Sequence, residues 1–232
     1  MTDSHKHHLL DIDEQSAPKE SFGDSAKLVI SGLRELNQEG AANDYFHLPI
    51  LLVSTGIERF LKATIGQNEL GLVFKSGSGG GNQLRPLLRQ ITTNYYSDEF
   101  LRQNPAVADE IRILKHDDRI LKLVDTFADF SMGARYYNLN ILEGMEPPGA
   151  CQEDELEKLR MEIMEESDSK NVDKEICYRI TVSCELFMRA LCRLAAMETN
   201  SGSSNRISGA VRHFLSLADE QLGTTDYSRL DF

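Results

Sequence analysis

The apolar stretch YFHLPILLVSTGIERFLKATI, Tyr45–Ile65, predicts a helix that carries charged side chains in its second half. Leu51 precedes Glu58 by seven residues, and this spacing puts both side chains on one helical face. Leu61 and Ile65 follow Glu58 by three and seven residues and continue that face. A carboxylate on an apolar face needs a partner, because an unpaired buried charge is unfavourable. The alternative is an ordinary helix edge on which Glu58 is solvated.

The composition is that of a folded globular protein. The 232 residues are 41% hydrophobic and 27% charged, which provides enough apolar side chains for a core. This length fits one large helical domain or a core with appendages, and we favour one domain. No run approaches the roughly 18 apolar residues of a membrane helix, and the N-terminal residues contain no apolar signal core. We therefore expect a cytoplasmic protein that does not enter a membrane.

The charge balance restricts the partners that the whole surface could attract. A net charge of −12 and a pI near 5.0 argue against a surface built for tight, nonspecific binding to nucleic acid. This argument concerns the average charge only. It leaves room for a local basic cleft, particularly in an oligomer.

The cysteines and the N-terminal histidines give no metal-site pattern. Four cysteines show no CxxC spacing, and we interpret them as small core hydrophobes in a reducing compartment. They are Cys151, Cys177, Cys184 and Cys192. His5, His7 and His8 lie in a polar tail that supplies no supporting hydrogen-bond partners, so metal binding there would be adventitious. We expect neither a metal nor a cofactor.

Helical periodicity predicts an all-α fold. A first helix is expected from Asp24, as its N-cap, to a stop at Gly40. The second is the opening stretch, which should end at Gly66. Two further helices are predicted over Leu84–Ile91 and, after an Asn-Pro start, over Asn104–Phe127.

The segment EGMEPPGACQEDE marks the clearest boundary in the chain, and helices follow it. We predict an acidic helix over Glu153–Glu166 and a short last helix over Ile207–Ala218. Between them lies the strongest amphipathic pattern, which uses Val172, Ile176, Ile180, Cys184, Phe187, Leu191 and Leu194. The predicted organisation is a flexible acidic tail over residues 1–22, a helical core over 23–145, and C-terminal helices over 146–232 that pack on the same core.

Several short motifs occur in an order found in a known family. GIERFLKATI is followed by a lysine-bearing, glycine-rich loop at Lys75–Asn82, by the short helix LRPLLRQI, and by an apolar segment that ends GARYYNL. Together these motifs resemble HEPN-like domains, which are helical bundles. The resemblance covers roughly Asp24–Leu142 and implies a homodimer, with the C-terminal helices completing or decorating the bundle.

The glycine-rich loop departs from the family pattern. Many relatives have Gly-His-Asp-Leu where this chain has Gly81-Asn82-Gln83-Leu84, so the histidine is absent. The loop also lacks the order of a phosphate-binding P-loop, and we predict that Lys75–Asn82 is a mobile loop. HEPN-like proteins include ribonucleases, nucleotide-binding partners of nucleotidyltransferases, and proteins without known activity, so the family alone does not choose a function.

The resemblance implies one catalytic candidate. Nucleases of this fold use an arginine and a histidine with four to six residues between them, and the two act across a dimer. The imidazole assists proton transfer at the ribose 2′-hydroxyl while the guanidinium binds phosphate. Arg206 and His213 have this spacing, although Ile207 stands where a polar residue often follows the arginine. The alternative is that the pair simply begins a surface helix.

A second arginine and histidine, Arg112 and His116, have only three residues between them and fall outside the family spacing. With Lys115 and Arg119 they are typical of the exposed face of an amphipathic helix. We interpret them as solvated.

Arg135, in GARYYNL, is surrounded in the sequence by apolar residues in the same way as Glu58. We predict that Glu58 and Arg135 form a structural ion pair between two helices, because a guanidinium can satisfy both carboxylate oxygens.

Three functional hypotheses follow. The first is a HEPN-like binding or regulatory module linked to nucleotide- or RNA-based defence or toxin systems. The second is a metal-independent ribonuclease that uses Arg206 and His213. The third is a helical protein-interaction module that recruits a partner through the Glu153–Glu166 helix.

Overall fold

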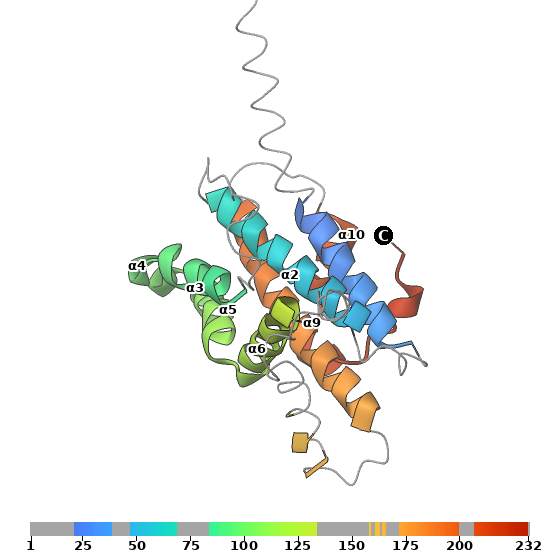
Figure 1. Ribbon diagram of the computed structural model, residues 1–232. Coiled ribbons are helices and arrows are strands. Elements are labelled where there is room, and N and C mark those ends of the chain that lie inside the picture. The colour runs from blue at the N-terminus through green and yellow to red at the C-terminus, as the bar shows by residue number, and fades with distance from the viewer. Residues whose placement is uncertain are drawn as a thin grey trace, which may run out of the picture.

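Amphipathic segments form helices throughout the part of the chain that the computed structural model describes (Figure 1). The described residues are 21–38, 47–68, 84–133, 158, 161–162, 164–165, 172–199 and 207–231. They contain no strand, which confirms the all-α prediction. None of their helices is long and apolar enough to cross a membrane.

The first two helices lie side by side, dark blue and cyan in Figure 1. One covers residues 21–36, and α2 covers His47–Asn68, with Pro49 in its first turn. Asp24 lies inside the first helix, so the prediction that it is the N-cap is wrong, and the helix ends at residue 36, before Gly40. The helix α2 also continues past Gly66, because glycine is tolerated in a helix that packing stabilises.

Two glycines let this antiparallel pair of helices approach closely. A Cβ atom at Gly56 of α2 would lie 2.8 Å from the Ser25 carbonyl oxygen and 2.9 Å from the Val29 nitrogen. A Cβ atom at Gly32 would lie 2.8 Å from the Pro49 carbonyl oxygen. Each glycine therefore faces the backbone of the other helix, where any side chain would collide.

Four helices form the next part of the fold: α3 over Leu84–Asn94, α4 over Asp98–Gln103, α5 over Pro105–His116 and α6 over Asp118–Gly133. The predicted single helix over Asn104–Phe127 is therefore two helices, which break at Asp117. The Asp117 side chain accepts hydrogen bonds from the Arg119 backbone nitrogen at 3.0 Å and from its guanidinium at 2.6 and 3.0 Å. The Asp117 side chain thus accepts from a backbone N–H in the first turn of α6, and this local bond competes with the hydrogen bond of a continuous helix.

The start of α5 is where the Asn-Pro signal predicts it. Pro105 is the first helical residue and Asn104 is the N-cap position, but the Asn104 side chain makes no capping bond. Instead, its amide donates to the Phe100 carbonyl at the end of α4, at 2.9 Å. The short helix α4 was not expected, and Ser97 caps it by accepting from the Phe100 nitrogen.

The longest helix, α9 over Val172–Thr199, packs against α2, α5, α6 and α10, of which α10 covers Gly209–Ser216. Its predicted apolar face is buried from Ile176 to Leu194, in one hydrophobic cluster with residues of the preceding helices. Cys184 and Cys192 are buried in this cluster, and Cys177 is half-buried. Burial raises the pKa of the Cys177 thiol to about 11, so it carries no thiolate at neutral pH.

The chain then folds back along α9 through two short 3₁₀ helices, η2 over Asp219–Gln221 and η3 over Tyr227–Arg229. Of the predicted acidic helix Glu153–Glu166, the described residues 158, 161–162 and 164–165 are helical.

We predict that Gly56→Ala lowers the free energy of unfolding by roughly 1 to 3 kcal/mol, since the added methyl group meets backbone that cannot move aside. Chemical denaturation followed by circular dichroism measures this. Arg59→Ala, at an exposed position of the same helix, is the control and should change stability by less than about 0.5 kcal/mol. Equal stability of Gly56→Ala and wild type would contradict the close approach.

Candidate functional site

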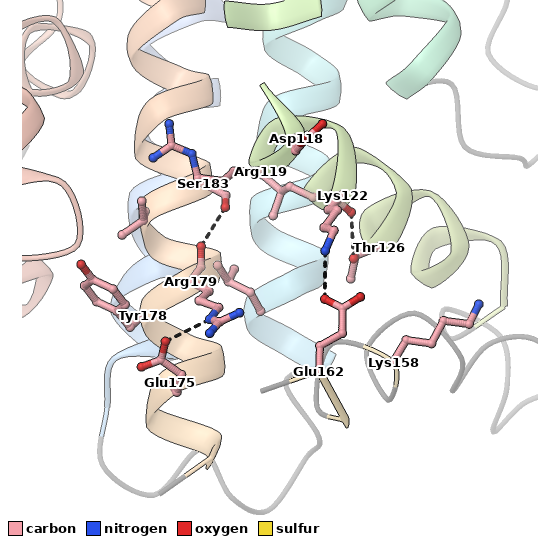
Figure 2. A pocket seen from close by; sticks show the side chains of 13 residues that line it. Asp118, Arg119, Lys122, Thr126, Lys158, Glu162, Glu175, Tyr178, Arg179 and Ser183 are labelled. Atoms are coloured by element: carbon pink, nitrogen blue, oxygen red, sulfur yellow. Dashed lines mark hydrogen bonds and ion pairs between the residues drawn. The ribbon is translucent and has the colours of Figure 1, made fainter. Parts of the chain in front are cut away.

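A groove between α6 and the first half of α9 encloses about 510 Å³ (Figure 2). Side chains one and two turns apart on each helix line it, because residues at i, i+4 and i+8 share a helical face. The helix α6 contributes Asp118, Arg119, Lys122, Leu123 and Thr126, and α9 contributes Glu175, Tyr178, Arg179, Ile180, Val182 and Ser183. Lys158 and Glu162 complete the lining from the segment that precedes α9.

The described lining of the groove contains one more basic residue than acidic residues, in a chain that is acidic overall. Arg119, Lys122, Lys158 and Arg179 all line the groove, although the chain carries a net charge of −12. Three of the lining residues are acidic, namely Asp118, Glu162 and Glu175. The lining therefore has a small excess of basic residues, and Arg119, Lys122 and Arg179 are each paired with a carboxylate.

Two ion pairs lie inside the groove, and Figure 2 draws both. The Lys122 ammonium lies 2.9 Å from a Glu162 carboxylate oxygen. The Arg179 Nε lies 2.9 Å from Glu175, one turn earlier on the same helix. All four side chains keep at least a third of their surface exposed, so these pairs add little to stability.

Arg119 stands at the rim of the groove and is oriented by Asp117. The hydrogen bond that Arg119 donates to Asp117 raises the pKa of Arg119 and lowers the pKa of Asp117. Both groups are therefore charged at neutral pH, and Arg119 lines the groove as one member of an ion pair.

The rest of the lining is apolar or weakly polar. Leu123 and Ile180 belong to the buried core and form the floor, and Tyr178 is 48% exposed. The Ser183 hydroxyl donates to the Arg179 carbonyl at 2.8 Å, and the Thr126 hydroxyl donates to the Lys122 carbonyl at 2.9 Å. Since both protons serve the helix backbone, neither hydroxyl is arranged as a nucleophile with a base beside it.

A second polar cluster lies deeper, on the second half of α9. Glu185 has no exposed surface, and its carboxylate accepts hydrogen bonds from the Tyr227 hydroxyl at 2.7 Å and from the Gly223 backbone nitrogen. Burial raises the pKa of Glu185, although these hydrogen bonds act in the opposite direction. The buried carboxylate thus holds the C-terminal segment against α9.

Two arginines extend this cluster along the same face of α9. Arg189 is 4% exposed, pairs with Asp219 at 2.6 Å and donates to the Leu217 carbonyl at 3.2 Å. Arg193 pairs with the buried Glu110 of α5 at 2.8 Å. Arg34 of the first helix donates to the Tyr227 carbonyl at 3.1 Å, which fixes the C-terminal segment from its other side.

The two clusters touch at Gly223. This residue has a positive φ of 79°, which glycine adopts without strain, and it packs directly on Tyr178 and Val182. A Cβ atom there would lie 2.6 Å from the Val182 Cγ2. The turn held by Glu185 therefore supports the wall of the groove that carries Tyr178.

The structure describes one member of each predicted residue pair. Glu58 is half-buried and bonds to Lys62, one turn later on α2, at 2.5 Å. Arg135 lies outside the described residues, as does the Lys75–Asn82 loop, so the Glu58–Arg135 pair stays a prediction.

His213 lies on α10, half-buried, with its ring edge-on to Tyr227 at a centroid distance of 5.7 Å. Burial lowers its pKa, so the imidazole is neutral at neutral pH. Arg206 lies outside the described residues, and the catalytic pair stays a prediction. Arg112 and His116 are exposed on α5, as expected, while Arg119 belongs to α6.

Sequence reasoning missed both the groove and Glu185. A signal for Glu185 was present, since Val182, Met188 and Cys192 stand three before, three after and seven after it, the same kind of spacing that drew attention to Glu58. The groove had no such signal, because its two helical walls lie about 50 residues apart in the chain.

We predict that Tyr227→Phe lowers the free energy of unfolding by roughly 1 to 3 kcal/mol, because it removes a hydrogen-bond donor from a buried carboxylate. Equilibrium unfolding in urea provides the measurement. Tyr178→Phe removes the same hydroxyl from an exposed tyrosine of α9 and should be near neutral. If the two variants are equally stable, the Glu185–Tyr227 bond does not hold the segment.

A pH prediction follows from the raised pKa of Glu185. The folded state binds this proton more tightly than the unfolded state, so stability should fall as pH rises above the ordinary value of 4.5 towards the folded pKa. Glu185→Gln carries no such proton, and its stability relative to wild type should increase over that pH range. Unfolding measured at several pH values tests this, and a pH-independent difference would refute it.

Comparisons with known proteins assign neither fold family nor function. No family model, no curated protein and no solved structure matches this chain. Its function must therefore be argued from the groove itself.

Proposed function

We propose that this chain is a HEPN-like binding or regulatory module, and that its ligand binds in the groove between α6 and α9. One observation carries the proposal: basic side chains of two facing helices, Lys122 of α6 and Arg179 of α9, line one cavity with an apolar floor, in a chain of net charge −12. A solvated helix face would not require cations from separate segments to meet.

The size and lining of the groove favour a small molecule. Its volume of about 510 Å³ falls within the roughly 300 to 1,000 Å³ of small-molecule sites. Apolar walls with a few converging polar groups are typical of such sites. A ligand that suits this lining has an anionic group and a flat or apolar body.

The groove offers different side chains to the anionic group and to the flat body of such a ligand. Lys122 and Arg179 reach into the groove from opposite helices and are placed to hold an anionic group (Figure 2). Tyr178 offers an exposed aromatic ring on the same helix as Arg179. A nucleotide combines a phosphate with a planar base, so this class fits the groove and agrees with the family resemblance.

The groove supports binding better than catalysis. Its described lining contains no histidine or cysteine, and its Ser183 and Thr126 hydroxyls are engaged with backbone carbonyls. Arg179 and Lys122 could hold a phosphate, but the carboxylates beside them, Glu175 and Glu162, are engaged in ion pairs with these same cations.

The absence of tryptophan from the sequence allows a direct test. Tyr178→Trp places a single fluorophore at the groove, and adenosine monophosphate is the probe. We predict a saturable fluorescence change with adenosine monophosphate that adenosine, which lacks the phosphate, produces only weakly. Lys122→Gln in this background should weaken binding roughly fivefold.

Arg112→Gln, which removes an exposed cation of α5 away from the groove, is the matched control and should bind like the parent. Phe100→Trp places the reporter on α4, outside the groove, and should give no signal. Equal binding by the Lys122→Gln and Arg112→Gln variants would contradict the proposal, as would no response to millimolar adenosine monophosphate.

A further inference from the structure

The cations of the groove differ in how their carboxylate partners are attached. Glu175 and Arg179 stand one turn apart on α9, and Asp117 precedes Arg119 by two residues. Glu162 and Lys122 are 40 residues apart, and their contact joins α6 to a separate segment. Figure 2 shows the Glu162 carboxylate reaching across the groove to the Lys122 ammonium.

This difference determines which carboxylate can leave. A partner one turn away on the same helix stays near its cation, since the Cβ atoms of such residues are about 5 to 6 Å apart. Asp117 is also held by several hydrogen bonds to Arg119, which lower its pKa. The side chains of Lys122 and Glu162 are 63% and 45% exposed, and such solvent-exposed pairs are weak.

A dissolved anion can therefore replace Glu162 more readily than the other acidic residues. The replacement restores a contact of the same kind at Lys122, because phosphate and carboxylate oxygens both accept from an ammonium group. Glu162 itself can then be solvated, since nearly half of its side chain already meets water.

We propose that Glu162 is an internal competitor of the groove, whose carboxylate occupies the position of the ligand's anionic group and must leave Lys122 when the ligand binds. This inference rests on the proposed function, because it concerns the same groove. It makes Glu162 a specificity-determining residue, since a neutral ligand cannot replace its carboxylate at Lys122 and leaves the Glu162–Lys122 contact in place.

The expected effect is a tighter complex when the competitor is removed. Apparent affinity is reduced by the fraction of molecules in which the site is open, so Glu162→Gln should bind adenosine monophosphate about two- to fivefold more tightly. Adenosine carries no anionic group, and its binding should change by less than twofold. The phosphate dependence separates competition from a general change in the shape of the groove.

Glu165→Gln is the matched control. Glu165 lies on the same segment, is exposed and does not line the groove, so its substitution makes the same change in net charge. We expect this variant to bind adenosine monophosphate like the parent. An equal gain for Glu162→Gln and Glu165→Gln would overturn the inference in favour of a long-range charge effect.

The experiment titrates adenosine monophosphate and adenosine into the full chain that carries the Tyr178→Trp reporter. Three single variants, Glu162→Gln, Glu165→Gln and Lys122→Gln, are measured in this background. A double variant combines Glu162→Gln with Lys122→Gln. When Lys122 is replaced, Glu162→Gln should no longer raise the affinity for adenosine monophosphate, because Glu162 competes with the ligand only for the Lys122 ammonium. A gain that persists without Lys122 would refute the competition.

The results distinguish a failure of the proposed function from a failure of the internal-competitor proposal. If no variant binds adenosine monophosphate, the groove is not the ligand site, and both the proposed function and the internal competition are refuted. If the parent binds but Glu162→Gln binds equally well, the internal competitor alone is refuted.

Discussion

The burial of Glu185 on α9 is the constraint on which the arrangement of the C-terminal half depends. A carboxylate with no exposed surface must be satisfied by hydrogen-bond donors, and here Tyr227 and Gly223 supply them. Arg189 repeats the requirement one turn later, because it pairs with Asp219 and donates to the Leu217 carbonyl. The segment after α10 therefore lies along α9 because charged groups there require its polar atoms, and not through apolar packing alone.

The first half of α9 also lines the groove. Tyr178, Arg179 and Ser183 line the cavity, whereas the next turns enter the core. The transition occurs where Gly223 packs on Tyr178 and Val182. Since that turn donates to Glu185, the stability of the buried cluster and the shape of the groove wall are coupled through one glycine.

The sequence predicted helices whose apolar residues recur every three or four positions, such as α2 and α9. They did not predict the break at Asp117, because a side chain that bonds to its neighbour's backbone competes with a continuous helix without changing the apolar pattern. The spacing rule that singled out Glu58 would have identified Glu185 if applied to α9. The groove was not predictable, because Lys122 and Arg179 look like ordinary solvated charges until the fold brings their helices together.

The paired glycines of the first two helices have a mechanical consequence. Gly32 faces the backbone near Pro49, and Gly56 faces the backbone near Ser25 and Val29. Sliding one helix along the other by a single turn would move larger side chains into both positions, so the two contacts fix the axial register of the pair. These two helices therefore form a pair that resists sliding along its axis.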